Sequence, residues 1–313
     1  MEHETAAVFP ATLHVQGHDA VRDHLTHSTA ATFLFVGPPN VGRRTTALWW
    51  FAYLSCESDT RPCGRCASCQ RWQTGYHPDV LIKEPVATTR SGAQAANPVL
   101  RLDQIALRRG PGADPNPLIP WLRSAPSGTI KMAIVMASDK MTESAANAFL
   151  KTLEEPPANT KIVLIAPSRS SVLPTVASRA ETVRFGSVPV TPGANEPAWR
   201  SDIRYGRVGA VMRSRSADVS DGEWREPIEA LVTAMDHDTA ALLDACERFV
   251  EAERKHPEVD FEGNLVELVR AERPEWLGAL VHIMVERREA KAAYVSQRTL
   301  STHLALALAA VVS

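Results

Sequence analysis

The sequence predicts an α/β domain built on a doubly wound parallel sheet, followed by a region of helices. Three observations carry this prediction. Short apolar runs rich in β-branched residues alternate with segments of helical periodicity, which is typical of a parallel sheet covered by helices. The first run leads into a glycine-rich turn that resembles a phosphate-binding loop. The strand signals stop near residue 185, and helical patterns then continue to the end of the chain.

The apolar runs expected to form buried strands cover residues 32–37, 131–136 and 161–166. The second run precedes a predicted helix over 142–155, in which apolar residues recur at helical spacing: Ala145, Phe149, Leu150 and Leu153. Residues 84–130 carry many prolines, glycines and serines, and we expect loops there around one helix near 103–109.

The second half of the chain begins with a proline-rich stretch, 187–198, which we interpret as a linker. A small helical segment is expected at 202–213. From residue 223 onward the pattern is helical. The final helix over 300–312 is apolar on nearly every side, so we expect it to be buried either in its own domain or against a partner. Breaks between these helices are predicted near Pro257, Gly263 and Pro274.

Composition sets loose limits on function. The 313 residues include 44% hydrophobic and 22% charged residues, ordinary values for a globular protein. A formal net charge of −2 argues against a chain that grips nucleic acid alone. The longest uninterrupted apolar run, 304–312, is too short to span a membrane. The acidic N-terminus does not resemble a signal peptide, so we expect a cytoplasmic protein.

Four of the five cysteines lie in one short segment, with the spacing C-x6-C-x2-C-x2-C. Short Cys-x2-Cys steps supply the tetrahedral thiolates that zinc prefers, and disulfides are disfavoured in a chain without an export signal. A catalytic zinc is disfavoured because four thiolates leave no position for water. The remaining Cys246 is expected to be a core residue. The sequence therefore predicts a structural zinc site made of Cys56, Cys63, Cys66 and Cys69.

The glycine-rich turn, GPPNVGRRT from Gly37, has lost the residues that handle nucleotide in a GxxxxGK[ST] loop. After Gly42, Arg43 replaces the lysine that neutralises terminal phosphates, and Arg44 replaces the hydroxyl that binds magnesium. Arginine keeps the charge but not the compact shape of lysine. Such a turn alone is weak evidence, because glycine-rich turns before helices are common.

A second loss lies at the end of the 131–136 run. An ATPase needs acidic residues there to hold magnesium and orient water, whereas this chain has Met136 and Ala137, with Asp139 the first acid. Two separate segments therefore lack magnesium ligands, so no functional ATP or magnesium site is expected.

The order of GPPNVG, the cysteines, GYHPD, SDKMTESAANAFLKTLEEPP and LPTVASR closely resembles the delta-prime subunits of bacterial DNA polymerase III, clamp-loader members of the AAA+ family. The resemblance is strong over roughly residues 12–185. It implies a RecA-like AAA+ domain at 1–185 with a zinc knuckle at 56–69, a small helical lid at 186–220 and a helical collar at 221–313.

The resemblance also implies partners and a working arginine. The partners are gamma/tau ATPase subunits and a delta subunit in a hetero-pentameric ring, which reaches the sliding clamp and primed DNA through the complex. The family's Ser-Arg-Cys motif is present as Ser178-Arg179-Ala180, so Arg179 is the expected arginine finger for a neighbouring subunit. A nucleotide-sensing arginine of the lid is replaced by Gly209.

Two other functions stay open on the sequence. The first is an active AAA+ ATPase of the gamma/tau type, in which Thr45 and Asp139 would supply the magnesium ligands. The second is a zinc-dependent nucleic-acid binding module with a vestigial nucleotide fold, which would bind DNA tightly on its own.

Overall fold

The computed structural model describes residues 15–74, 76–88, 94–108, 110, 112–191, 200, 205, 207, 221–236, 239–256, 259–292 and 296–312. The chain divides into two compact units, 1–186 and 187–313. Among the described residues, no helix combines the length and apolar character needed to cross a membrane.

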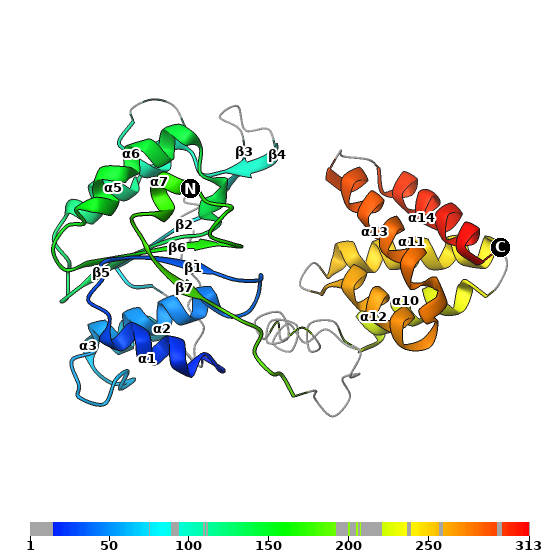
Figure 1. The fold of residues 1–313 in the computed structure, drawn as a ribbon, viewed down its shortest axis with the longest axis horizontal. Helices are drawn as coiled ribbons and strands as arrows, with labels where there is room; N and C mark the ends of the chain where they lie inside the picture. Colours follow the sequence, from blue (N-terminus) through cyan, green and yellow to red (C-terminus); the bar gives the residue numbers. More distant parts are fainter. Residues whose placement is uncertain are drawn as a thin grey trace. The chain divides into compact units, whose positions relative to one another are not determined.

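The first unit is built on a five-stranded parallel sheet in the order β2-β5-β6-β1-β7 (Figure 1). The three predicted strands are present as β1, β5 and β6. Every residue of β1 and β5 is buried, which explains why they appear in the sequence as continuous apolar runs. The strands are β1 (Thr32–Val36), β2 (Val80–Lys83), β5 (Lys131–Val135), β6 (Thr160–Ala166) and β7 (Glu181–Arg184).

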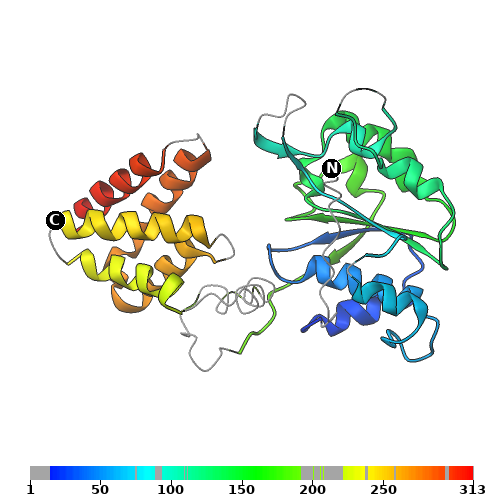
Figure 2. The same ribbon diagram turned by 180° about the vertical axis from the view of Figure 1, so that it is seen from behind.

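Helices cover both faces of this sheet (Figures 1 and 2). One face packs against α1 (Asp19–His27), α2 (Arg43–Ser55) and α3 (Ala67–Gln73). The other face is covered by α4 (Leu102–Ile105), α5 (Leu118–Arg123), α6 (Glu143–Glu154) and α7 (Pro174–Ala177). The doubly wound α/β fold predicted from the sequence is confirmed.

The expectation of loops around one helix in 84–130 is wrong. This segment forms an antiparallel hairpin of β3 (Val86–Thr88) and β4 (Gln94–Val99), followed by the two short helices α4 and α5. The helix near 103–109 ends at Ile105. The prolines in this segment indicate loops, but Pro117 is the N-cap of α5. Leu118 and Leu122 of this helix pack into the core.

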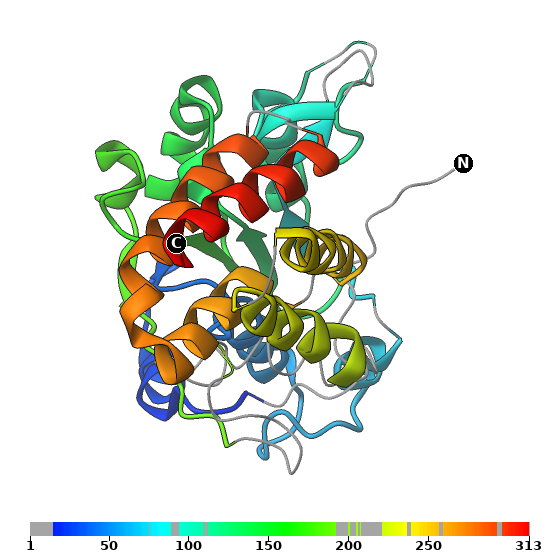
Figure 3. The same cartoon turned by 90° about the vertical axis from the view of Figure 1, so that its right-hand side faces the viewer.

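The second unit contains five described α-helices around one apolar core. Figure 3 shows α13 and α14 lying side by side, in agreement with their packing. The helices are α10 (Asp221–Ala234), α11 (Thr239–Lys255), α12 (Phe261–Glu272), α13 (Leu277–Ala292) and α14 (Gln297–Val312), with a 3-10 turn, η2 (Pro274–Trp276), before α13.

The sequence expectations for this unit have different outcomes. The predicted break near Pro274 is present, whereas no break occurs at Gly263, which lies in the first turn of α12 and whose amide donates to the side chain of Asp260. The last helix enters the core through Leu304 and Leu308, but Leu306 is 62% exposed, so burial of that face against a partner stays a prediction. Cys246 is a core residue as predicted, and burial raises the pKa of its thiol to about 12.

The predicted lid, 186–220, lies mostly outside the described residues. So do the helical segment expected at 202–213, the proline-rich stretch from 192 onward and Gly209. The division into core, lid and collar therefore stays a prediction.

Candidate metal centre and phosphate loop

Helix α2 connects the two candidate sites of the first unit. Its N-terminus follows Gly42 at the end of the glycine-rich turn, and its C-cap residue is Cys56, the first of the clustered cysteines. Between these ends, Trp50 packs the helix against the sheet: it is fully buried and contacts Phe33 of β1 edge-on. One buried helix thus sets the positions of both sites.

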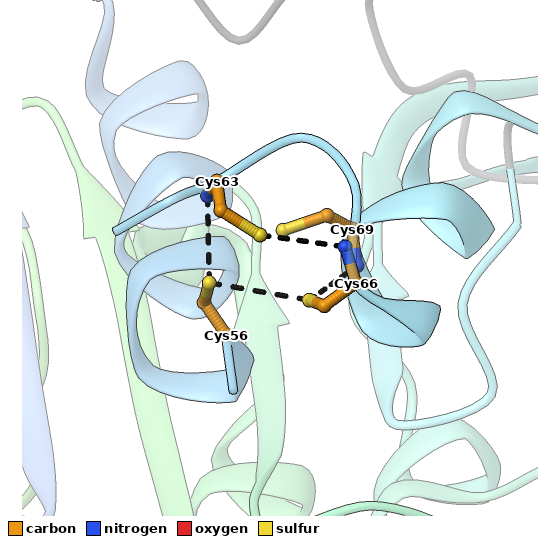
Figure 4. A group of neighbouring side chains, drawn as sticks. All are labelled: Cys56, Cys63, Cys66 and Cys69. Atoms are coloured by element: carbon orange, nitrogen blue, oxygen red, sulfur yellow. Dashed lines mark hydrogen bonds between the residues drawn. The ribbon is translucent and has the colours of Figure 1, made fainter. Parts of the chain in front are cut away.

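The structure brings the four predicted cysteines together. Their sulfur atoms all lie within 4.8 Å of one another and point toward a common centre (Figure 4). Four thiolates around zinc, at about 2.3 Å each, would lie roughly 3.8 Å apart. The Sγ atoms of Cys66 and Cys56 are 4.0 Å apart, close to that value. The cluster can therefore hold a metal ion.

Backbone amides orient these sulfurs. The amide of Cys63 donates to Cys56 Sγ at 3.4 Å, that of Cys66 to Cys63 Sγ at 3.3 Å, and that of Cys69 to Cys66 Sγ at 3.5 Å. Such donors favour the charged thiolate that a metal needs. The Cys-x2-Cys spacing places the sulfurs of Cys63 and Cys66 near the amides three residues later. Because Cys66 accepts the amide of Cys69, it is also the N-cap of α3.

The thiols differ in how easily they ionise. Amide hydrogen bonds from Arg65 and Cys66 lower the pKa of Cys63 to about 6. Burial, the largest influence on Cys66, raises its pKa, but amide donors outweigh it and the net direction is downward. Burial raises the pKa of Cys69 to about 12. A metal that binds all four must therefore displace a proton from Cys69 at neutral pH.

The GYHPD motif connects the cysteine cluster to the sheet. His77 is 2% exposed, packs against Phe51 and Trp72, and accepts the amide of Asp79 at Nδ1. Its Nε2 therefore carries the proton and faces Ser68 Oγ at 3.3 Å, while Ser68 donates to Ser55 Oγ at 2.8 Å. Burial lowers the pKa of His77 to about 4, so the ring stays neutral at physiological pH.

The glycine-rich turn depends on the backbone conformations of its two glycines. Gly37 has φ 152°, and a Cβ there would lie 2.3 Å from the carbonyl oxygen of Phe185. Gly42, with φ 98°, is the N-cap of α2. Both glycines are thus required by the turn itself. The amide of Gly37, however, donates to Pro167 O at 3.1 Å and bonds within the protein.

Both arginines that follow Gly42 are engaged within the protein. Arg43 Nη1 donates to the carbonyl oxygen of Ala166, at the end of β6. Burial lowers the pKa of Arg43, and the carboxylate of Asp139 opposes that shift. Arg44 Nη1 donates to Glu84 Oε1 at 3.1 Å, just after β2.

Of the described residues beside the loop, Thr46 and the two residues after β5 provide no free oxygen ligand for magnesium. Thr46 Oγ1 donates to Gly42 O at 3.0 Å as an ordinary helix contact, and its side chain is fully buried. At the end of β5, Met136 offers a thioether and Ala137 a methyl group. Asp139 follows in a 3-10 turn, and its charge acts on Arg43.

Arg179 follows Ser178, the C-cap residue of α7. Its Nε donates to Glu154 Oε1 at 2.6 Å, and Nη2 contacts the same oxygen. Its Nη1 donates to Thr175 O at 2.6 Å. The neighbouring Ser178 Oγ donates to Thr175 O at 3.2 Å and lies 3.4 Å from Arg179 Nη1. Arg179 is thus a partly exposed guanidinium held at its inner edge.

Sequence reasoning located most of the site residues and missed their partners. The cysteines converge as predicted, whereas Arg179 lies apart from them. The carboxylates of Glu84 and Glu154 were not singled out. Only Glu154 had a signal in the sequence, since it belongs to the LEEPP stretch that supports the family resemblance.

Several known proteins are similar to part of this chain. DNA polymerase III subunit delta' of Pseudomonas aeruginosa is 33% identical over 153 residues, which cover 48% of this chain and 41% of that protein. The delta' subunit of Bacillus subtilis is 31% identical over 176 residues, covering 56% and 46%. DNA polymerase III subunit tau of Bacillus subtilis is 27% identical over 218 residues, covering 68% and 32%. The chain thus matches less than half the length of these two delta' subunits.

The sheet order and the glycine-rich turn between β1 and α2 define an α/β protein of the phosphate-loop class, with an inserted four-cysteine cluster. A family model described as DNA polymerase III, delta subunit, matches residues 18–189, more than half of the chain. The chain belongs to this family, and the resemblance to its delta-prime type is confirmed.

Proposed function

We propose that this chain is a subunit of a DNA polymerase III clamp loader that does not hydrolyse ATP itself and offers Arg179 to a neighbouring ATPase subunit. It would assemble with gamma/tau-type and delta subunits in a five-membered cytoplasmic ring that loads the sliding clamp onto primed DNA. The observation that carries the proposal is the pairing of a disabled phosphate loop with a retained, partly exposed arginine.

The state of the phosphate loop supports the inactive half of this proposal. An entering triphosphate would have to displace Arg43 from the Ala166 carbonyl and Arg44 from Glu84. It would gain no metal ligand in return, because Arg44, Met136 and Ala137 carry no oxygen in their side chains. Hydrolysis needs that metal to neutralise charge developing on the phosphate.

We assign zinc to the cysteine cluster and give it a structural role. The donor set is four sulfurs, which selects zinc over oxygen-preferring cations. The four thiolates complete a tetrahedral shell, so a bound zinc would have no open position for water or substrate. The ion would supply cross-linking between the end of α2 and the start of α3.

An active ATPase of the gamma/tau type is the second candidate, because the match to tau covers 68% of this chain. It would need Thr45 and Asp139 to hold magnesium. The charge of Asp139 acts on the Arg43 guanidinium, which stands where a magnesium ion would need that carboxylate, and the hydroxyl of Thr46, next to Thr45, donates to Gly42 O. These observations favour the inactive assignment.

The proposed function is tested by replacing Arg179 in a reconstituted loader. Arg179→Ala should fold normally and join the complex, because a partly exposed arginine contributes little to stability. Arginine fingers are worth about 10³–10⁵ in rate, so hydrolysis should collapse at the one neighbouring site that Arg179 serves. ATPase stimulated by clamp and primed DNA is the measurement.

Arg179→Lys is the matched variant, and it should rescue little because an ammonium cannot reproduce the guanidinium fork. Unchanged ATPase and clamp loading by the Arg179→Ala complex, at equal assembly, would make Arg179 an ordinary surface residue.

A further inference from the structure

The carboxylate that holds Arg179 comes from a separate element of the fold. Glu154 is the last residue of α6, in the LEEPP stretch, and lies 25 positions before Arg179 in the sequence. Its carboxylate receives both Nε and Nη2 of Arg179 on the same oxygen, Oε1. The ends of α6 and α7, which pack against each other, thus meet through this pair.

The contacts divide the guanidinium into a held part and a presented part. A guanidinium has five N–H donors in a fixed plane. Glu154 Oε1 receives Nε and Nη2, while Nη1 donates to Thr175 O and, at 3.4 Å, to Ser178 Oγ. Among the contacts that the described residues make, the second N–H of Nη2 stays available to an outside acceptor. The side chain of Arg179 is 29% exposed and that of Glu154 48%, so the pair is open to solvent.

These contacts preorganise the guanidinium of Arg179 and do not block it from a neighbouring phosphate. A free arginine loses rotamer freedom when it reaches a phosphate, whereas one already held by two partners loses less. Charge stabilisation in a transition state is most effective when the donors are placed before the reaction begins. Thr175 is fixed in turn, because Pro174 starts α7 and Val176 and Ala177 are buried beneath it.

We propose that Glu154 is a positioning residue for Arg179. It holds the guanidinium so that the remaining N–H of Nη2 faces the phosphate of a neighbouring subunit. This inference rests on the proposed function of Arg179. It gives the first glutamate of the LEEPP stretch a role in the rate of hydrolysis at a site that belongs to another chain.

The test uses loaders reconstituted with Glu154→Ala, Glu154→Gln, Arg179→Ala and the double variant Glu154→Ala/Arg179→Ala. Steady-state ATPase is measured against ATP concentration with clamp and primed DNA present. Glu154→Ala should lower kcat by about two- to fivefold, the scale of one exposed ion pair, and leave KM unchanged, because the held arginine acts in the transition state. Glu154→Gln should recover part of the loss, since its amide oxygen still accepts from Nε.

The matched control is Glu155→Ala, which removes the adjacent exposed carboxylate at the C-cap of α6 and should leave kcat unchanged. The double variant should equal Arg179→Ala alone, because Glu154 is proposed to act only through that arginine. A further loss in the double variant would show a general structural role and overturn the proposal.

Two results separate this inference from the function on which it rests. A large loss with Arg179→Ala and none with Glu154→Ala keeps the finger and refutes the positioning role. Higher kcat in Glu154→Ala also refutes it, because Glu154 would then restrain Arg179. No loss with Arg179→Ala overturns the proposed function and this inference together.

Discussion

The two ends of α2 differ in the side chains that they offer to a ligand. At the C-terminal end all four sulfur ligands are present, converge within 4.8 Å and are oriented by amide donors. At the N-terminal end the turn has kept its glycines and lost its side chains, and Arg43 and Arg44 bond to the protein itself. Side chains suited to metal binding are thus present at one end of this helix, whereas the other end keeps the glycines of the GxxxxGK[ST] pattern without its lysine and hydroxyl.

The retained backbone of the loop has a physical reason. Gly37 cannot accept a side chain, because Phe185 O lies where a Cβ would be, and this contact joins β1 to the end of β7. The side chains of Arg43 and Arg44 face no such constraint. The turn is therefore needed for folding whether or not it handles nucleotide.

The largest effect is expected when one sulfur of the cluster is removed. Cys66→Ser should abolish stoichiometric metal binding, from one zinc per chain to none, because Cys66 is both a ligand and the N-cap of α3. The strands of the sheet should keep their amide protection, since α3 covers only one edge of the core. Metal content by mass spectrometry under native conditions is the measurement.

Cys246→Ser is the control for that experiment, because Cys246 lies in the second unit and outside the cluster. It should keep its zinc. Stoichiometric metal in Cys66→Ser, or none in the parent protein, would remove the metal centre from the account.

The loop end of α2 is tested by Gly37→Ala. The φ of 152° and the clash with Phe185 O should strain the folded state. They should lower the free energy of opening of β1 by about 2–3 kcal/mol, the range expected for strain at a special backbone position. Hydrogen exchange of residues 32–36 measures this directly. Gly186→Ala, where a Cβ meets nothing within 4 Å, should change exchange by less than about 0.5 kcal/mol. Equal effects of the two substitutions would contradict a structural role for the turn.

A smaller effect is expected from pH on the metal centre. Cys69, whose pKa burial raises to about 12, must release a proton when a metal binds, so affinity should fall as pH falls through the neutral range. Cys63, with its pKa lowered to about 6, also takes up a proton below that pH, and the fall should steepen there. Competition with a chromophoric zinc chelator measures the affinity. An affinity independent of pH would exclude coordination by thiolates.

The sequence predicted the parts of the fold that depend on short-range pattern. The buried strands β1, β5 and β6 and the helix α6 were all visible as apolar runs or helical periodicity. The short edge strands β2 and β7 were missed, because four residues with mixed burial give almost no periodic signal. The hairpin of β3 and β4 was missed because β3 has only three residues and β4 contains Pro98, a residue that argues against a strand.

The residues of the candidate sites also divide into those that local spacing predicts and those that depend on long-range packing. The cysteines could be found from spacing, because all four ligands lie within 14 residues. The partners of the arginines could not, since Glu84 lies 40 positions from Arg44 and Glu154 lies 25 positions from Arg179. Such contacts depend on which strands and helices lie together, and no local pattern encodes them.

The most direct test of the account is ATP hydrolysis by the isolated, zinc-loaded chain. We predict no magnesium-dependent turnover above background, because Arg44, Met136 and Ala137 provide no oxygen for the metal. The double variant Arg43→Lys/Arg44→Thr should stay inactive as well, since the strand end after β5 would still lack its acids. Turnover by the parent chain near ~1 s⁻¹, the lower end of typical enzyme rates, would contradict the claim that this end of α2 has lost its chemistry.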